Sequence, residues 1–222
     1  MAQQLVGAFP AEAMVAEATP TPPRTSTEVY EALRGNCADG GDGVEPLRAL
    51  LGRAADKSDP VAGGDGTHFS EVGLRAALPF VDAIVSKLQA QLVVSDSTLC
   101  PVGSGWRDKW SAIARSGLAV PARPAWGCSF GGSWNSFRWA VEAAVEEFGE
   151  CDRILVLIAG NDCKPQSDAA QIHGEMKSLA ALWAAKGTEI LYVEVVPPAD
   201  QQVPLWDWNE GETASGEDAR TS

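Results

Sequence analysis

The sequence has few of the residues that build metal sites and disulfide frameworks. It contains only two histidines, His68 and His173, and five cysteines, an odd number. The cysteines are irregularly spaced and none forms a Cys-x-x-Cys pair, which indicates neither a zinc site nor a set of disulfides. Because unpaired thiols of this kind are usually reduced in the cytosol, we expect a cytoplasmic protein.

Positive charge and long apolar runs are also scarce. The chain has 17 Lys and Arg residues against 30 Asp and Glu residues, a formal net charge of -13. Nucleic acids and anionic membranes bind basic surfaces, so this composition argues against both as partners. No apolar run approaches the ~20 residues that a membrane span needs, and the N-terminal residues lack the basic region of a signal peptide.

What the sequence does contain is enough apolar residues for the core of one ordinary domain. Of its 222 residues, 45% are hydrophobic. The composition of residues 1–25 predicts a flexible N-terminal segment. The acidic and polar residues 209–222 predict a disordered tail. We expect the single folded domain to span residues 26–208.

Helical and strand patterns alternate along this domain. In residues 137–148 the apolar positions, from Phe137 to Phe148, form one buried stripe, and Ser167 is expected to cap the last helix. Residues 153–160 are a continuous apolar run, typical of a strand buried on both faces. We expect helices over 25–35, 45–56, 70–91 (with a break or kink at Pro79), 105–116, 137–148 and 167–186, and strands over 92–94, within 118–126, and over 153–160 and 189–196.

This alternation predicts a three-layer α/β/α domain with a parallel sheet covered on both faces. In such sheets, ligands bind beyond the carboxyl ends of the strands. A serine, an aspartate–histidine pair, an amide side chain and glycine amides, which are the parts of an acyl-transfer site, are expected at that edge. They come from Ser95-Asp96-Ser97, Gly160-Asn161-Asp162, Asp65 and His68, and residues 127–133, "GCSFGGS".

Four blocks of the sequence resemble those of the SGNH hydrolases, also called the GDSL esterase/lipase superfamily. They are "LVVSDSTL", "GCSFGGS", "ILVLIAGNDC" and "DGTHFSEVG". The last two are the most specific, because they match the family's Gly-x-Asn-Asp and its Asp-x-x-His with a following glycine. The resemblance implies a flavodoxin-like sheet and a serine hydrolase that cleaves esters without a metal or other cofactor. The substrate is then a small-molecule ester or an acetylated carbohydrate.

The same resemblance assigns roles to individual residues. Ser97 is the nucleophile, His68 is the general base, and Asp65 orients His68. The oxyanion is held by the Ser97 amide, by the Asn161 side chain and by a glycine amide of the second block. Gly131 is the first choice for that amide, and Gly132 is the alternative.

This sequence departs from the family pattern in three ways. The family's glycine before Asp-Ser is Ser95, and the first glycine of Gly-x-Asn-Asp is Ala159. The family's serine block comes first and its histidine block last, whereas His68 precedes Ser97. A circular permutation explains this order, because a helix ending near Gln89 can feed a strand at Leu92 directly. In that arrangement, residues 60–90 carry the base block and residues 91–200 carry the nucleophile and oxyanion blocks.

The changed order of the blocks also fits two alternatives to a permuted enzyme. The chain can be a fragment of a tandem array, and two chains can then exchange halves to form a homodimer. Ser95 and the changed order also suit a catalytically inactive binding or scaffold module.

We assign no function to His173. Four tryptophans at helical spacing are expected in the core, namely Trp106, Trp110, Trp139 and Trp183. Trp206 and Trp208 are expected either in a loop over the cleft or as anchors for a partner.

Overall fold

The computed structural model describes residues 25, 27, 29, 43–101, 105–131, 135–158, 160–162 and 168–195. The N-terminal segment, most of the expected helix 25–35, the acidic tail, and Trp206 and Trp208 lie outside these residues, so those predictions stay predictions. The described helices are α2 (Val44–Ala54), α3 (Glu71–Leu88), α4 (Trp106–Gly117), α5 (Phe137–Phe148) and α6 (Ala169–Ala184). The described strands are β1 (Leu92–Ser95), β2 (Ala122–Pro124), β3 (Cys128–Ser129), β4 (Asn135–Ser136), β5 (Arg153–Ile158) and β6 (Glu189–Glu194).

The main sheet has four strands in the order β2-β1-β5-β6, and all neighbours are parallel. The expected central position of β1 beside β5 is confirmed, with Ser95 in register with Leu157 on one side and Pro124 on the other. The central strands β1 and β5 are apolar and almost entirely buried because helices cover both faces of the sheet, whereas β2 and β6 at its edges are mostly half-buried or exposed. Their carboxyl ends therefore share one edge of the sheet.

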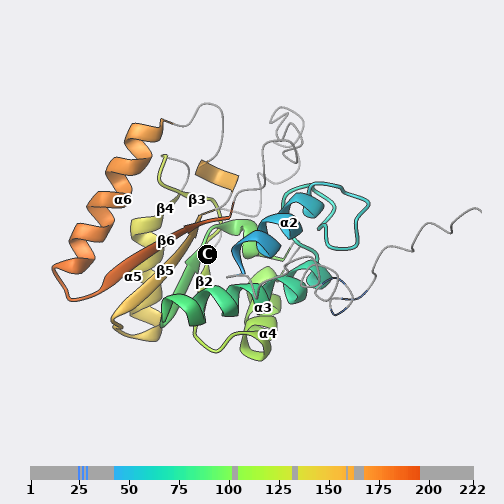
Figure 1. Ribbon diagram of the computed structural model, residues 1–222, viewed down its shortest axis with the longest axis horizontal. Helices are drawn as coiled ribbons and strands as arrows, with labels where there is room; N and C mark the ends of the chain where they lie inside the picture. The colour runs from blue at the N-terminus through green and yellow to red at the C-terminus, as the bar shows by residue number, and fades with distance from the viewer. Residues whose placement is uncertain are drawn as a thin grey trace, which may run out of the picture.

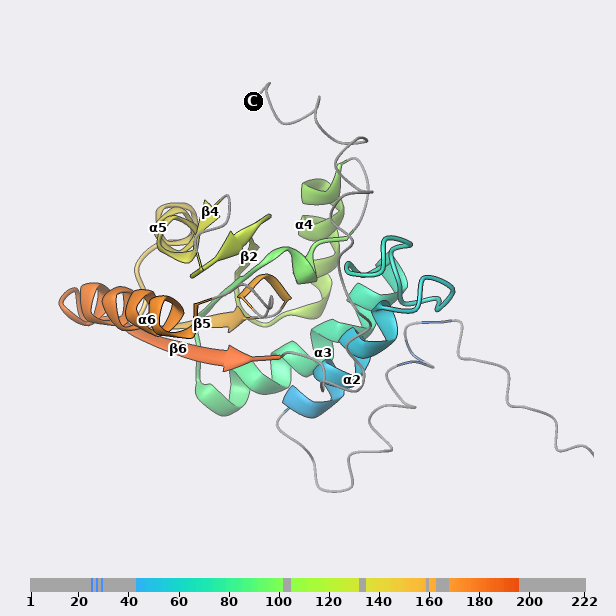
Figure 2. The same cartoon turned by 90° about the horizontal axis from the view of Figure 1, so that it is seen from above.

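Alternate residues of the central strands supply two cores, one on each face. Val93, Leu155 and Leu157 pack with α2, α3 and α4, whereas the residues between them pack with α5 and α6. Figures 1 and 2 show α2 and α3 on one side of the sheet and α5 and α6 on the other. The three-layer α/β/α arrangement with a parallel sheet is thus confirmed.

The helix α3 leads directly into β1. It ends at Leu88, and its C-cap Gln89 takes the left-handed conformation with φ 54°. The Gln91 backbone N–H then donates to the Arg153 carbonyl at 3.0 Å. The Gln91 side chain also accepts from the Asp152 backbone N–H at 2.7 Å. These bonds fix the start of β1 against β5. The segment before β1 therefore packs on the sheet as the sequence predicts.

Three details of the sequence prediction are wrong. Of the break or kink expected at Pro79, the break is absent: α3 continues through the proline, and Leu78 and Phe80 on either side of it are buried in the same core. Phe148 is 42% exposed rather than part of the buried stripe of α5. The cap of α6 is Asp168 instead of Ser167, since the Asp168 carboxylate accepts from two backbone N–H groups of the first turn.

The tryptophans divide between core and surface. Trp110 and Trp183 are buried, as predicted, whereas Trp139 is 46% exposed and Trp106 is half-buried. The last two therefore correct the expectation that all four belong to the core. Within the described residues, no helix is both long and apolar enough to cross a membrane.

Candidate active site

The candidate active site lies where three parallel strands end. β1 ends at Ser95 and is followed by the 3₁₀ turn η1 (Ser97–Leu99), and β5 is followed by a similar turn, η2 (Gly160–Asp162). β2 ends at Pro124, just before Trp126. The predicted residues Ser97 and Asn161 therefore come to the same sheet edge. Ser97 is buried with an exposure of 8%.

The predicted base, His68, belongs to a loop that its own aspartate organises. One carboxylate oxygen of Asp65, Oδ1, accepts from the backbone N–H groups of Thr67 and His68, both at 2.9 Å. Gly66, between Asp65 and Thr67, has a φ of 83°, a conformation that favours glycine. The loop is closed by the Gly63 N–H, which donates to the His68 carbonyl at 2.7 Å.

The second oxygen of Asp65 holds the histidine ring. Oδ2 lies 2.6 Å from His68 Nδ1. A carboxylate at this ring nitrogen holds the imidazole in the orientation that a catalytic base requires. Burial opposes ionisation of Asp65, but the hydrogen bond and charge of His68, together with the two backbone N–H groups, outweigh it and lower the pKa of Asp65 from 3.8 to about 2. Asp65 is therefore a carboxylate at neutral pH.

The other ring nitrogen of His68 is buried without a bond. Among the described residues, His68 Nε2 has no hydrogen-bond partner, and the side chain is only 10% exposed. Burying such a group without a partner is costly, so it is an expected place for a ligand or a reacting hydroxyl. The indole of Trp126 stacks on the imidazole, with ring centroids 4.6 Å apart and planes 10° apart.

The loop of residues 63–68, here called the base loop because it carries the predicted base His68, is joined to the segment that carries Ser97. Phe69, next to His68, is fully buried and forms a parallel β-bridge with Pro101. Pro101 follows Cys100, whose backbone N–H donates to the Ser97 carbonyl at 2.8 Å. Two consecutive backbone connections thus link the loop of His68 to the turn of Ser97, which come from different parts of the chain. In this structure the Ser97 hydroxyl is not hydrogen-bonded to His68 Nε2.

Two of the predicted oxyanion donors already have partners. One hydrogen of Asn161 Nδ2 is donated to the Cys128 carbonyl at 3.0 Å, which leaves the second hydrogen of this amide for a substrate. The Gly131 N–H donates to Asp162 Oδ1 at 2.8 Å, as does the Phe130 N–H. Gly131 is therefore not a free donor in this structure. The alternative, Gly132, lies outside the described residues.

Ser95, at a position where the resemblance implies a glycine, does not strain the backbone. Gln89 is the only non-glycine residue with a positive φ among those the structure describes, so Ser95 does not occupy a conformation that needs glycine. Its hydroxyl is buried and donates to the Asp96 carbonyl at 3.1 Å. This removes the backbone argument against an active site.

Two residues of the site were missed from the sequence. Trp126 has no motif relation to His68, and only the fold brings the two rings together. Asp162 holds the Phe130–Gly131 loop through its carboxylate; the sequence analysis placed Asp162 at this edge beside Asn161 but gave it no role. The acidic side chain directly after Asn161 is the one signal from which this role could have been predicted.

The chain was compared with protein-family models, with curated proteins and with solved structures, and it matches none of them.

Within the described residues, no three His, Cys, Asp or Glu side chains are placed to hold a metal ion. Burial raises the pKa of the Cys128 thiol to about 12, and it also raises the pKa of Cys100. Neither thiol is therefore a ready nucleophile at neutral pH.

Proposed function

We propose that the chain is a serine hydrolase that cleaves carboxylic esters through an acyl-serine intermediate. In this proposal, it has the SGNH-type site on a flavodoxin-like sheet, with the motif blocks in circularly permuted order. The observation that carries the proposal is the Asp65–His68 pair. Its 2.6 Å contact fixes one ring nitrogen, and the other is buried and unbonded among the described residues.

Each residue has a defined part in the proposed reaction. His68 Nε2 takes the proton of the Ser97 hydroxyl as the oxygen attacks the ester carbonyl. The alkoxide formed at the carbonyl oxygen is stabilised by the Ser97 amide, the second hydrogen of Asn161 Nδ2 and, in place of Gly131, the Gly132 amide. His68 then returns the proton to the departing alcohol. Water, deprotonated by the same nitrogen, hydrolyses the acyl-serine.

A second candidate function is an inactive binding module. The observation that favours it is the bond from the Gly131 amide to Asp162, because an engaged amide does not stabilise an oxyanion. In that case the same edge of the sheet would bind an ester or acid without cleaving it.

Hydrolysis of 4-nitrophenyl acetate separates the two. The Ser97→Ala and His68→Ala variants should each lose activity by about 10³-fold or more, and the double variant should be hardly worse, because the two residues act as a unit. His173→Ala is the matched control, because His173 is the chain's other histidine and is exposed on α6. A folded wild-type chain without activity would favour the binding module.

A further inference from the structure

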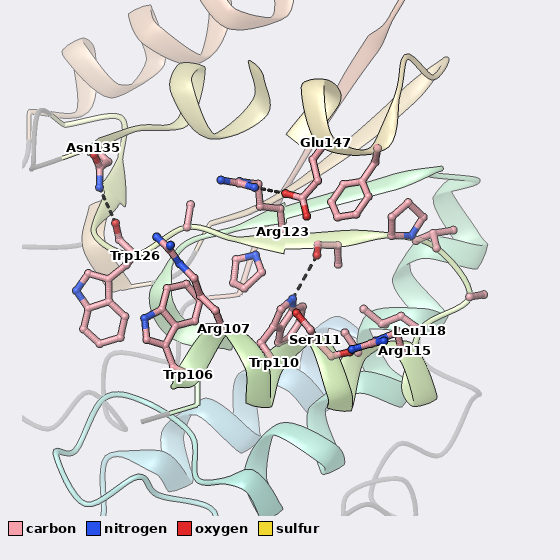
Figure 3. Close-up of a pocket in the computed structure, with 18 of the residues that line it drawn as sticks. Trp106, Arg107, Trp110, Ser111, Arg115, Leu118, Arg123, Trp126, Asn135 and Glu147 are labelled. Atoms are coloured by element: carbon pink, nitrogen blue, oxygen red, sulfur yellow. Dashed lines mark hydrogen bonds and ion pairs between the residues drawn. The ribbon is translucent and has the colours of Figure 1, made fainter. Parts of the chain in front are cut away.

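A groove of about 680 Å³ runs along the free edge of the main sheet. Its floor is the edge strand β2, and its walls are α4 and the C-terminal end of α5 (Figure 3). Trp110 ties one wall to the floor, because its indole N–H donates to the Ala122 carbonyl at 3.3 Å. The volume suits a small molecule of one or two rings.

One residue, Trp126, connects the groove to the candidate base. Trp126 lines the groove and also stacks on the His68 ring. Trp106 continues this aromatic lining, with its ring centroid 6.1 Å from that of Trp126. A ligand in the groove therefore contacts the indole that stacks on His68, although His68 and Ser97 are not themselves among the residues that line the groove.

The groove is positively charged although the chain as a whole is strongly negative. Three arginines line it, Arg107, Arg115 and Arg123, against one carboxylate, that of Glu147. Arg123 is paired with Glu147. Among the described residues, neither Arg107 nor Arg115 is paired with a carboxylate: Arg107 lies over the Trp106 ring at 5.4 Å, and Arg115 Nε donates to the Ser111 carbonyl at 2.9 Å.

The two unpaired arginines lie on one wall of the groove. They are eight residues apart on α4, which corresponds to about 12 Å along the helix axis. Both side chains are exposed and both line the groove, with Ser111 between them (Figure 3). An anionic group in the groove thus meets an uncompensated guanidinium at either end. Guanidinium groups bind carboxylates through paired, charge-assisted hydrogen bonds.

We propose that this groove binds the alcohol part of the substrate, and that this part is a ring that carries a negative charge. The indoles of Trp106 and Trp126 face the ring, and Arg107 or Arg115 binds its carboxylate. The inference rests on the proposed function, because it names the class of ester cleaved at Ser97. A large polyanion does not fit, since the net charge of -13 repels it outside the groove.

The test compares 4-acetoxybenzoate with its neutral methyl ester. With the wild-type chain, KM for the anionic ester should be about tenfold lower, the loss expected when one charge-assisted bond is absent. Replacing both arginines, Arg107→Gln and Arg115→Gln, should raise KM for the anionic ester about tenfold and leave the neutral ester unchanged. Arg138→Gln is the matched control, because Arg138 is an exposed arginine of α5 outside the groove lining.

Binding of the product 4-hydroxybenzoate, measured by calorimetry, tests the groove without any reaction. Arginine-dependent binding by a chain that hydrolyses neither ester would support the groove and overturn the hydrolase. Hydrolysis of both esters with equal KM, unaffected by the arginine replacements, would overturn the groove and leave the hydrolase standing. Absence of both binding and hydrolysis by the folded chain would overturn both.

Discussion

At the scale of single residues, the site depends on a few polar contacts with separate roles. Asp65 uses one oxygen for two backbone N–H groups and the other for the His68 ring, so the same carboxylate shapes the loop and orients the imidazole of the proposed base. Asn161 is likewise fixed by the Cys128 carbonyl before any substrate arrives. Donors that are oriented in advance stabilise a developing charge without reorganisation during the reaction.

Replacing Asn161 tests its part in the reaction. Asn161→Ala should lower kcat for acetyl ester hydrolysis by about 10²–10³ with little change in KM, because the bond to the oxyanion forms mainly in the transition state. The side chain is half-buried and donates to the Cys128 carbonyl, a single hydrogen bond whose loss the fold should survive, which circular dichroism checks. Full activity of the variant would make Asn161 a turn residue only.

Asp65 also links stability to pH. Its pKa is lowered to about 2 from 3.8, so its ionised form stabilises the fold above about pH 4, and this contribution is lost as the pH falls towards 2. The side chain is 40% exposed, and solvent screening reduces the contribution to about 1 kcal/mol. Urea unfolding of wild type and Asp65→Asn should differ by this amount near neutral pH and converge at about pH 2. A difference that does not change with pH would contradict the pairing.

At the scale of elements, the sequence predicts the helices and strands well and their ends less well. Long periodic stretches such as residues 137–148 leave little choice, because only one face of the helix can be buried. Ends depend on single side chains, and Asp168 caps α6 as effectively as a serine would one residue earlier. The break expected at Pro79 is absent because the burial of its neighbours outweighs the local preference of proline.

Gly73 shows how tightly one element packs on the base loop. A Cβ atom at this position would lie 2.3 Å from the Val61 carbonyl oxygen and 2.9 Å from the Phe69 ring, the two residues that flank the loop of His68. Gly73→Ala should therefore lower the free energy of unfolding by about 1–3 kcal/mol, measured with urea.

Gly174 on α6 is the matched control. A Cβ there meets nothing within 4 Å, so Gly174→Ala should raise the free energy of unfolding by about 0.5–1 kcal/mol through helix propensity alone. Equal effects of the two substitutions would contradict the close packing at Gly73.

At the scale of the whole molecule, the order of the blocks along the chain matters less than where the sheet places them. Residues before β1 pack on the same sheet as those after it, and the β-bridge between Phe69 and Pro101 joins the two parts. The sequence predicts which polar residues reach the carboxyl edge, because parallel strands all end there. It does not predict the Trp126–His68 contact or the bond from Gly131 to Asp162, since both depend on loop paths that have no periodic pattern.

The central claim is that Ser97 is a nucleophile activated by His68, and covalent labelling tests it most directly. The folded wild-type chain is treated with a fluorophosphonate, and the modified residue is located by mass spectrometry of its peptides. We predict one adduct, on Ser97, that is absent from Ser97→Ala and forms far more slowly in His68→Ala. A folded wild-type chain that stays unlabelled, or that carries its label on a different serine, would contradict the claim.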